Sequence, residues 1–442
     1  MGSEQLPLRN VGIYRNLPTF PPTIKDMTAI IVGATGISGF NTLRSLLESP
    51  SRWGKIYAVS RSPPPAEMLS LLTPTQQSHL QHVSIDLTGS AEKTADALRT
   101  SGVKHADHVF FFGYIHPKGK SAMDPGLARE LVETNAPLFE NFLRALPLAG
   151  IAPKRILLQT GGKHYGCHIG RARLPYVESD PPPTHLAENF YYHQVDALRR
   201  FCAEHPETAW NVVRPFGIVG AAPGGGMNCF LPYAVLAATQ AKKGEPIFFG
   251  GDIEEWQNEC VHSSARLTGF LCEWAVLEEK CANQDFNAGD GCAMSFDRFF
   301  EELARWYGVE KGIEGPEPDE SKYEELPLAG GKDAPLGYGP PTAIRLSRKL
   351  SDWCQEPANH EAWKAVMRDA GLKEDVFELG SDTIAMGDFT YYRIGQPSMA
   401  KVRRLGFNGF VDTVESVFEA YNDLAVLGLI PKPNVEAARP MV

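Results

Sequence analysis

The stretch Met27-Thr-Ala-Ile-Ile-Val-Gly33-Ala-Thr-Gly36-Ile-Ser-Gly39 decides the fold of this chain. Its short β-branched run ends in glycine, a pattern that predicts a buried strand of a parallel sheet. The segment 41–48 that follows carries leucines on one face and predicts a helix. Glycines between a strand and a helix permit a tight turn, and the amides at the helix N-terminus can receive a pyrophosphate. The stretch therefore predicts the start of a dinucleotide-binding βαβ unit.

Strands and helices alternate from this stretch to Arg214. The pattern predicts strands over 55–60, 82–86, 108–112, 155–159 and 210–214, and helices over 66–80, 91–100, 125–146 and 191–205. This alternation predicts an α/β fold, a doubly wound parallel sheet of Rossmann type. Beyond Pro215 the pattern loosens into loops and helices, including an apolar-faced helix over 295–307, and we expect a smaller, mainly helical region that caps the substrate site.

This organisation predicts the division of the chain. We expect an N-terminal extension over 1–26, a dinucleotide-binding core over 27–220, and a substrate-capping region over 221–442 that is interleaved with the core. Residues 313–346 are rich in proline, glycine and acidic side chains, which predicts an exposed connection with little core of its own.

Charge and composition narrow the class of partner. Of 442 residues, 43 are Lys or Arg and 53 are Asp or Glu, so the net charge is −10 with no block of basic residues. This balance argues against nucleic acid and anionic membranes, and it favours a small molecule. No apolar run approaches the ~20 residues that a membrane helix needs. Residues 1–26 contain no signal-peptide pattern, so we expect a cytoplasmic protein. The eight cysteines include no Cys-x-x-Cys pair and no paired histidine spacing, so we expect reduced thiols and no metal site.

The end of the second predicted strand bears on the choice of cofactor. An enzyme selective for the unphosphorylated dinucleotide usually carries Asp or Glu there, whereas this chain has Ser60-Arg61. A guanidinium matches the geometry of a 2′-phosphate, so Arg61 predicts NADPH/NADP+; the alternative is a solvated surface arginine. Asp86-Leu87, after the third strand, is suited to hold the adenine, and Asp86 is equally suited to cap a loop.

Two further motifs carry candidate catalytic groups. Gln159-Thr-Gly-Gly-Lys163-His-Tyr165 ends a predicted strand, and Asn189-Phe-Tyr191-Tyr192 opens a predicted helix. Many reductases with this sheet use Tyr-x-x-x-Lys, but neither tyrosine of the second motif has a lysine four residues later. The lysine must come from elsewhere, and Lys163 is the candidate.

These motifs resemble the progesterone 5β-reductase/iridoid synthase-like (PRISE-like) branch of the short-chain dehydrogenase/reductase superfamily. The resemblance extends to Arg214-Pro-Phe-Gly-Ile-Val-Gly220, Phe286-Asn-Ala-Gly-Asp290 and Leu405-Gly-Phe-Asn-Gly-Phe410, and it covers about residues 27 to 431. It implies NADPH-dependent reduction of an activated C=C bond, with hydride delivered to the β-carbon of an enone or enal in a biosynthetic pathway.

The resemblance also implies residue roles. Lys163 and Tyr191 correspond to the catalytic groups: a phenol stabilises the enolate oxygen, and an ammonium supports the phenol and orients the nicotinamide ribose. The expected cofactor contacts are Gly33, Thr35, Gly36, Ile37, Gly39, Ser60, Arg61, Asp86, Leu87, Gln159, Lys163, Tyr191, Pro215, Ile218, Gly225, Gly226 and Met227, and the expected substrate contacts are Tyr114, Tyr165 and Met227.

Several alternatives stay open at this point. Tyr191 also suits an aromatic staple at a helix start, and Lys163 a surface ammonium, while Tyr192 favours packing. Gly113, Tyr114 and Val195 depart from the family pattern, and the loop 220–227 is unusually glycine-rich. The same groups would serve a carbonyl reductase, a non-redox cyclase or isomerase that retains NADP, or a redox sensor that binds NADPH without turnover. The sequence allows a monomer or a homodimer.

Overall fold

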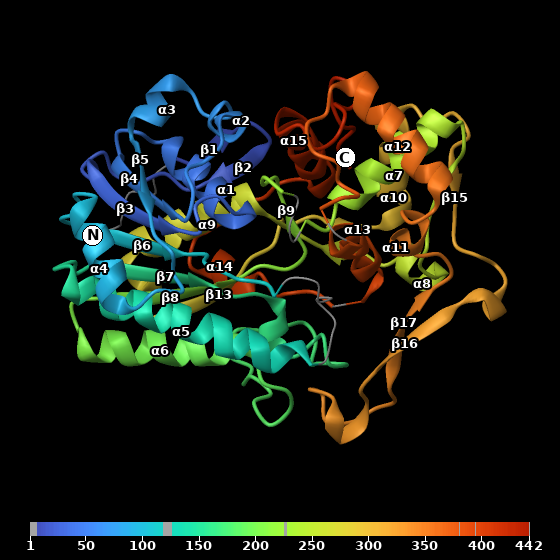
Figure 1. Cartoon of the computed structure of the whole chain (residues 1–442). Helices are drawn as coiled ribbons and strands as arrows, with labels where there is room; N and C mark the ends of the chain where they lie inside the picture. The colour runs from blue at the N-terminus through green and yellow to red at the C-terminus, as the bar shows by residue number, and fades with distance from the viewer. Residues whose placement is uncertain (1–6, 118–125, 225–227, 380, 394, 442) are drawn as a thin grey trace.

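A parallel sheet with helices on both faces forms one side of the molecule (Figure 1). The structure is a computed structural model, and it describes residues 7–117, 126–224, 228–379, 381–393 and 395–441. Among these residues, seven parallel strands form one sheet in the order β13-β8-β7-β6-β3-β4-β5. The strands are β3 (Met27–Val32), β4 (Trp53–Ser60), β5 (Leu80–Ser84), β6 (His108–Phe111), β7 (Arg155–Gln159), β8 (Ala209–Arg214) and β13 (Gln284–Asn287). The predicted doubly wound sheet is confirmed.

Helices cover both faces of this sheet, as its buried and continuously apolar strands require. On one face α1 (Ile37–Leu47) packs against α9 (Ala265–Leu277). On the other face lie α4 (Ala91–Thr100), α5 (Leu127–Leu148) and α6 (Phe190–Glu204), with α5 between its two neighbours. Because β3 pairs with both β4 and β6, the direction of winding reverses at the carboxyl end of β3. Ligands of open α/β sheets bind at such a point.

The first strands of the chain pack against its far end. Strands β1 (Arg9–Val11) and β2 (Tyr14–Leu17) form an antiparallel hairpin whose Tyr14 and Leu17 side chains are buried. The amide of Arg15 donates to the carbonyl of Phe410 at 2.9 Å, and the amide of Phe410 donates back at 3.1 Å. Much of the segment that the sequence predicts as an extension therefore belongs to the packed structure.

A mainly helical region lies beside the sheet (Figure 1). Its core is aromatic and includes Phe230, Tyr233 and Phe299, whose rings meet edge to face or tilted. The further elements of the chain are α2 (Ala66–Leu69), α3 (Pro74–Ser78), η1 (Gly162–Tyr165), β9 (Ile218–Val219), α7 (Leu231–Lys243), β10 (Ile247–Phe248), α8 (Ile253–Trp256), β11 (Cys260–Val261), β12 (Ser263–Ser264), η2 (Glu279–Cys281), β14 (Ala293–Met294), α10 (Phe296–Tyr307), β15 (Ile313–Glu314), η3 (Glu320–Lys322), β16 (Glu324–Leu328), η4 (Gly331–Asp333), β17 (Thr342–Leu346), α11 (Leu350–Trp353), α12 (Pro357–Ala370), α13 (Ser381–Asp388), η5 (Phe389–Tyr391), α14 (Ala400–Arg404) and α15 (Thr413–Val426). Within the described ranges, no helix has the length and apolar character needed to span a membrane.

Two segments differ from the expected local structure. Residues 313–346 contain an antiparallel hairpin, β16–β17, in which Ile344 and Leu346 are buried, so this segment has some core of its own. The helix expected over 66–80 is two short helices, because Thr73 caps a new helix that begins at Pro74.

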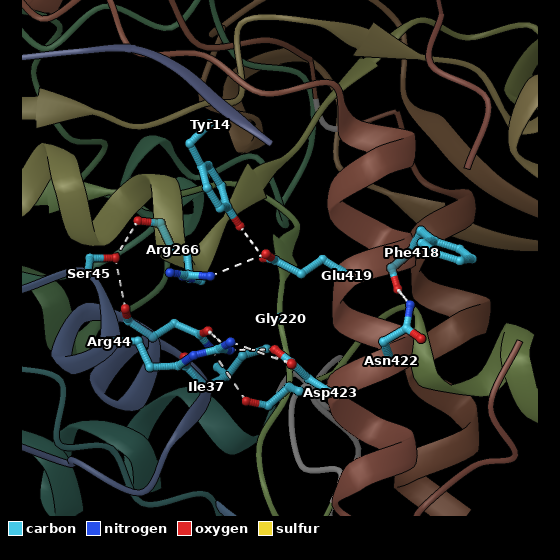
Figure 2. Close-up of polar contacts among 12 residues, drawn as sticks. Tyr14, Ile37, Arg44, Ser45, Gly220, Arg266, Phe418, Glu419, Asn422 and Asp423 are labelled. Atoms are coloured by element: carbon cyan, nitrogen blue, oxygen red, sulfur yellow. Dashed lines mark hydrogen bonds and ion pairs between the residues drawn. The ribbon is translucent and has the colours of Figure 1, made fainter. Parts of the chain in front are cut away.

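Ion pairs join α1 and α9 to α15, the last helix (Figure 2). The Arg44 guanidinium on α1 pairs with the Asp423 carboxylate on α15. The Arg266 guanidinium on α9 lies 3.2 Å from the Glu419 carboxylate, which also accepts a hydrogen bond from the Tyr14 hydroxyl. Helix α15 is therefore tied at once to α1, α9 and β2.

Candidate active site

The glycine-rich turn is too crowded for side chains. Gly33 has φ +79°, and a Cβ atom there would lie 2.9 Å from the carbonyl carbon of Phe112. A Cβ atom at Gly39 would lie 2.2 Å from the Gly33 carbonyl oxygen, so helix α1 passes directly over the turn. Gly36 is the N-cap of α1, and no side chain caps this end. The first amides of the helix can therefore donate to a bound anion.

A side chain from β7, two strands away from β3 in the sheet, contacts the start of helix α1. The Gln159 amide nitrogen donates to the Ser38 hydroxyl at 2.7 Å. The Gln159 amide oxygen is buried and has no hydrogen-bond partner within the described part of the chain. Thr35 and Ile37 are half-buried at the same end of the sheet. The predicted contacts of the pyrophosphate thus lie where the sheet reverses its winding.

The predicted contacts of the adenosine half follow β4 and β5. Ser60 donates from its hydroxyl to the Ser62 carbonyl at 2.8 Å, and the exposed Arg61 accepts at its carbonyl from the Ser84 hydroxyl at 2.8 Å. Asp86 accepts from the amide and hydroxyl of Thr88 at 3.0 and 2.8 Å, and these bonds lower the pKa of its carboxyl group. Asp86 therefore caps its loop, one of the two roles that the sequence leaves open.

Leu87, which follows Asp86, is half-buried against Gly113. A Cβ atom at Gly113 would lie 3.0 Å from the Leu87 Cδ1 atom, which brings the loop after β5 against the segment after β6.

Lys163 and Tyr191 are joined by one side chain, that of Asn189. The Asn189 carboxamide oxygen caps α6 by accepting from the Tyr191 amide at 3.0 Å, and its nitrogen donates to the Lys163 carbonyl at 2.9 Å. The Tyr191 hydroxyl lies 3.2 Å from the position of a Cβ atom on Gly161. The phenol therefore extends over the turn that carries Lys163. Sequence reasoning assigned Asn189 no role, although an asparagine before an apolar-faced helix is a recognisable N-cap.

Burial sets the protonation of both candidate catalytic groups. It lowers the pKa of the Lys163 ammonium, against which the thiols of Cys167 and Cys229 act weakly. Burial, together with the Tyr114 phenol, raises the pKa of Tyr191 above its ordinary value. Tyr191 is therefore a neutral hydrogen-bond donor at physiological pH, and the Lys163 ammonium loses its proton more readily than a solvated lysine does.

The neighbouring tyrosines lie in different surroundings. The Tyr192 hydroxyl donates to the His164 carbonyl at 3.0 Å, which fits the packing role expected for it. Tyr165, expected at the substrate, is buried: its hydroxyl donates to Asn287 at 2.7 Å, and its ring stacks on Tyr176 at 4.8 Å. Tyr114 is 37% exposed, and its ring stacks on Phe190 at 5.7 Å. Of the two predicted substrate contacts, Tyr165 and Tyr114, only Tyr114 is exposed to solvent, and it lies beside α6.

The other predicted contacts follow β8. Pro215 is buried and accepts at its carbonyl from the Gly162 amide at 3.1 Å, so it lies beside the turn of Lys163. Ile218 begins β9 and pairs with Ser263. Gly225, Gly226 and Met227 lie outside the described residues.

The sequence is similar to one known protein family and to several individual proteins. The profile of a family described as a PRISE-like Rossmann-fold domain matches residues 29–325. A short chain dehydrogenase from Penicillium aethiopicum is 27% identical over 92% of this chain and 99% of its own length. An (S)-8-oxocitronellyl enol synthase from Nepeta racemosa is 26% identical over 93% of this chain and 95% of its own. A 3-oxo-Delta(4,5)-steroid 5-beta-reductase from Arabidopsis thaliana is 28% identical over 65% and 70%.

Proposed function

The chain belongs to the PRISE-like Rossmann-fold family, and from this premise we propose that it is an NADPH-dependent oxidoreductase that reduces an activated C=C bond. Its substrate in this proposal is a hydrophobic enone or enal. The observation that carries the proposal is the Tyr191 hydroxyl above the Gly161–Lys163 turn, with Asn189 bonded to both partners.

The residues at the reversal of the sheet fit a phosphorylated dinucleotide. Only glycine fits at Gly33 and Gly39 in this turn, and the uncapped amides of α1 beside it can donate to a ligand's pyrophosphate. Arg61 is exposed at the end of β4, where its guanidinium can pair with a 2′-phosphate. NADPH, when bound, supplies the hydride.

The chain's own groups would stabilise the charge that develops on the substrate. Addition at the β-carbon of an enone places negative charge on the carbonyl oxygen, and the neutral Tyr191 phenol would donate a hydrogen bond to that oxygen. The Lys163 ammonium would hold the nicotinamide ribose and favour negative charge on the phenol. Both groups are largely buried, so these interactions act with little competition from water.

Isotope transfer tests this proposal. The protein is incubated anaerobically with NADPH deuterated at C4, the 4R and the 4S form in separate reactions, and with a panel of enals, enones and ketones, and the label is located by NMR. Label at the β-carbon supports the proposal. Label at the carbonyl carbon identifies a carbonyl reductase, and a product without label identifies a cyclase or isomerase. A Lys163→Met protein, run in parallel, controls for uncatalysed reduction.

A further inference from the structure

A large cavity opens away from the proposed dinucleotide site. Its volume is about 1010 Å³, and its walls come from residues 170–176, from the β16–β17 hairpin with the loop between its strands, from residues 252–258, and from residues 391–393 and 395. None of the residues predicted to contact the dinucleotide lines it. The volume is at the upper end of the range of small-molecule pockets.

Two of its four arginines are already neutralised by carboxylates. Arg345 lies 3.4 Å from Glu325 and 3.5 Å from Asp252. Arg393 lies 3.4 Å from the buried carboxylate of Glu255 and 3.1 Å from Glu254. These pairs fix one wall of the cavity, where the carboxylates outnumber the two arginines.

The other two arginines, Arg171 and Arg173, lie on the segment 170–176 and are exposed. Among the residues that the structure describes, the Arg171 guanidinium has no hydrogen-bond or ion-pair partner. Arg173 has one distant partner, Asp180, at 3.9 Å, and its side chain is 81% exposed. A guanidinium without a carboxylate partner is well suited to bind an anion through paired hydrogen bonds.

Apolar and phenolic groups accompany these charges. Leu174 is 57% exposed and Tyr338 is 69% exposed, and both line the cavity. The lining thus offers apolar surface beside two cations.

We propose that this cavity binds an amphipathic small molecule whose anionic group pairs with Arg171 and Arg173 and whose apolar body contacts Leu174 and Tyr338. The Tyr392 hydroxyl, in the same wall, donates to the carbonyl of Cys167, four residues after Lys163. The cavity therefore adjoins the catalytic turn, and its occupant is either the far end of the enzyme's own substrate or a separate ligand of the same chemistry.

Two matched fluorescent probes test the site without any turnover. 1-Anilinonaphthalene-8-sulfonate carries an anion, and N-phenyl-1-naphthylamine is its neutral counterpart. Both are titrated into the wild type, an Arg171→Gln/Arg173→Gln protein and an Arg368→Gln protein, which changes an exposed arginine of α12 that does not line the cavity. We expect the double variant alone to bind the sulfonate about ten-fold or more weakly, with the neutral probe unaffected. Equal sulfonate binding by all three proteins, or its displacement by NADP+, would overturn the proposal.

Steady-state kinetics then show whether the occupant of the cavity is the far end of the enzyme's own substrate or a separate ligand. An enone carboxylic acid and its methyl ester are compared as substrates of the wild type and the double variant; this arm rests on the proposed function. A rise in KM for the acid alone identifies the cavity as part of the substrate site, and unchanged KM values for both identify a separate ligand. A protein that reduces neither compound yet binds the sulfonate through Arg171 and Arg173 contradicts the proposed function and supports the cavity.

Discussion

Arg44 on α1 and Asp423 on α15 form a buried ion pair, so the helix that starts at the glycine-rich turn is bonded to the last helix of the chain. Their side chains are 11% and 12% exposed, and burial raises the pKa of Asp423 even beside the guanidinium. A pair in this position fixes the two helices relative to each other only while both charges are present.

We expect Asp423→Asn to lower the free energy of unfolding by about 3–5 kcal/mol, because it leaves the Arg44 cation buried without its counter-charge. Replacing both partners, as Arg44→Met/Asp423→Leu, should recover most of that loss. Urea denaturation of the three proteins measures both effects. A double variant no more stable than Asp423→Asn would show that the loss comes from packing and not from the unpaired charge.

Tyr191→Phe should lower turnover by roughly 10²- to 10⁴-fold with little change in NADPH affinity, because it removes the donor to the substrate oxygen. Tyr192→Phe is the matched control. It removes the bond to the His164 carbonyl, so it should cost about 1 kcal/mol of stability and leave turnover near normal. Steady-state kinetics with thermal denaturation separate the two, and an inactive Tyr192→Phe beside a normal Tyr191→Phe would reverse the assignment.

The pH dependence of kcat/KM should report Lys163. Burial lowers the pKa of Lys163 from its ordinary 10.5 and raises that of Tyr191, so Lys163 loses its proton first as the pH rises. Activity should therefore fall on the alkaline side at a pH below 10.5. Lys163→Arg should move this limb upward, because a guanidinium stays protonated. A limb at the same pH in both proteins would assign it to another group.

Asn189→Ala should lower kcat more than it changes the KM for NADPH, because it removes both bonds that hold Tyr191 and Lys163 together. It should also cost about 1 kcal/mol of stability through loss of the helix cap. Asn189→Asp keeps the acceptor for the Tyr191 amide and loses the donor to Lys163. We expect it to be nearly as stable as the wild type and still impaired in kcat. Full activity of Asn189→Asp would restrict Asn189 to its capping role.

We expect NADPH to bind at least about ten-fold more tightly than NADH, through pairing of Arg61 with the 2′-phosphate. Arg61→Ala should remove the preference by weakening NADPH alone, and thermal stability should not change because the residue is exposed. Isothermal titration with both dinucleotides gives the four dissociation constants. Equal affinities in the wild type would contradict the assignment.

The sheet could be predicted because its strands are buried on both faces. The expected strand over 155–159 and the expected helix over 91–100 coincide with β7 and α4, since continuous apolar runs and helical periodicity are local signals. The seventh strand, Gln284–Asn287, was not predicted: it is four residues long and is defined by pairing with a distant segment. The β16–β17 hairpin was not predicted, because the many prolines, glycines and acidic residues of this segment are typical of an exposed loop and outweigh its few buried apolar positions.

The candidate site divides in the same way. Lys163 and Tyr191 could be named from motifs, but their connection through Asn189 depends on how the turn after β7 meets the start of α6. Tyr165 lies two residues from Lys163, and the sequence placed it at the substrate. Its burial is decided by remote partners, Tyr176 and Asn287, which no local pattern reveals.

The contact of Arg15 with Phe410 has a consequence for how the protein is made. The N-terminus leaves the ribosome first, so the hairpin β1–β2 emerges almost 400 residues before Phe410, whose backbone bonds to Arg15. Tyr14 also packs on Phe270 of α9 at 5.7 Å, so the buried Tyr14 and Leu17 are covered completely only after later parts of the chain have emerged. Pairing of Arg15 with Phe410 is then a late step of folding during synthesis. A chain that stalls on the ribosome before residue 410 leaves this side of the hairpin exposed.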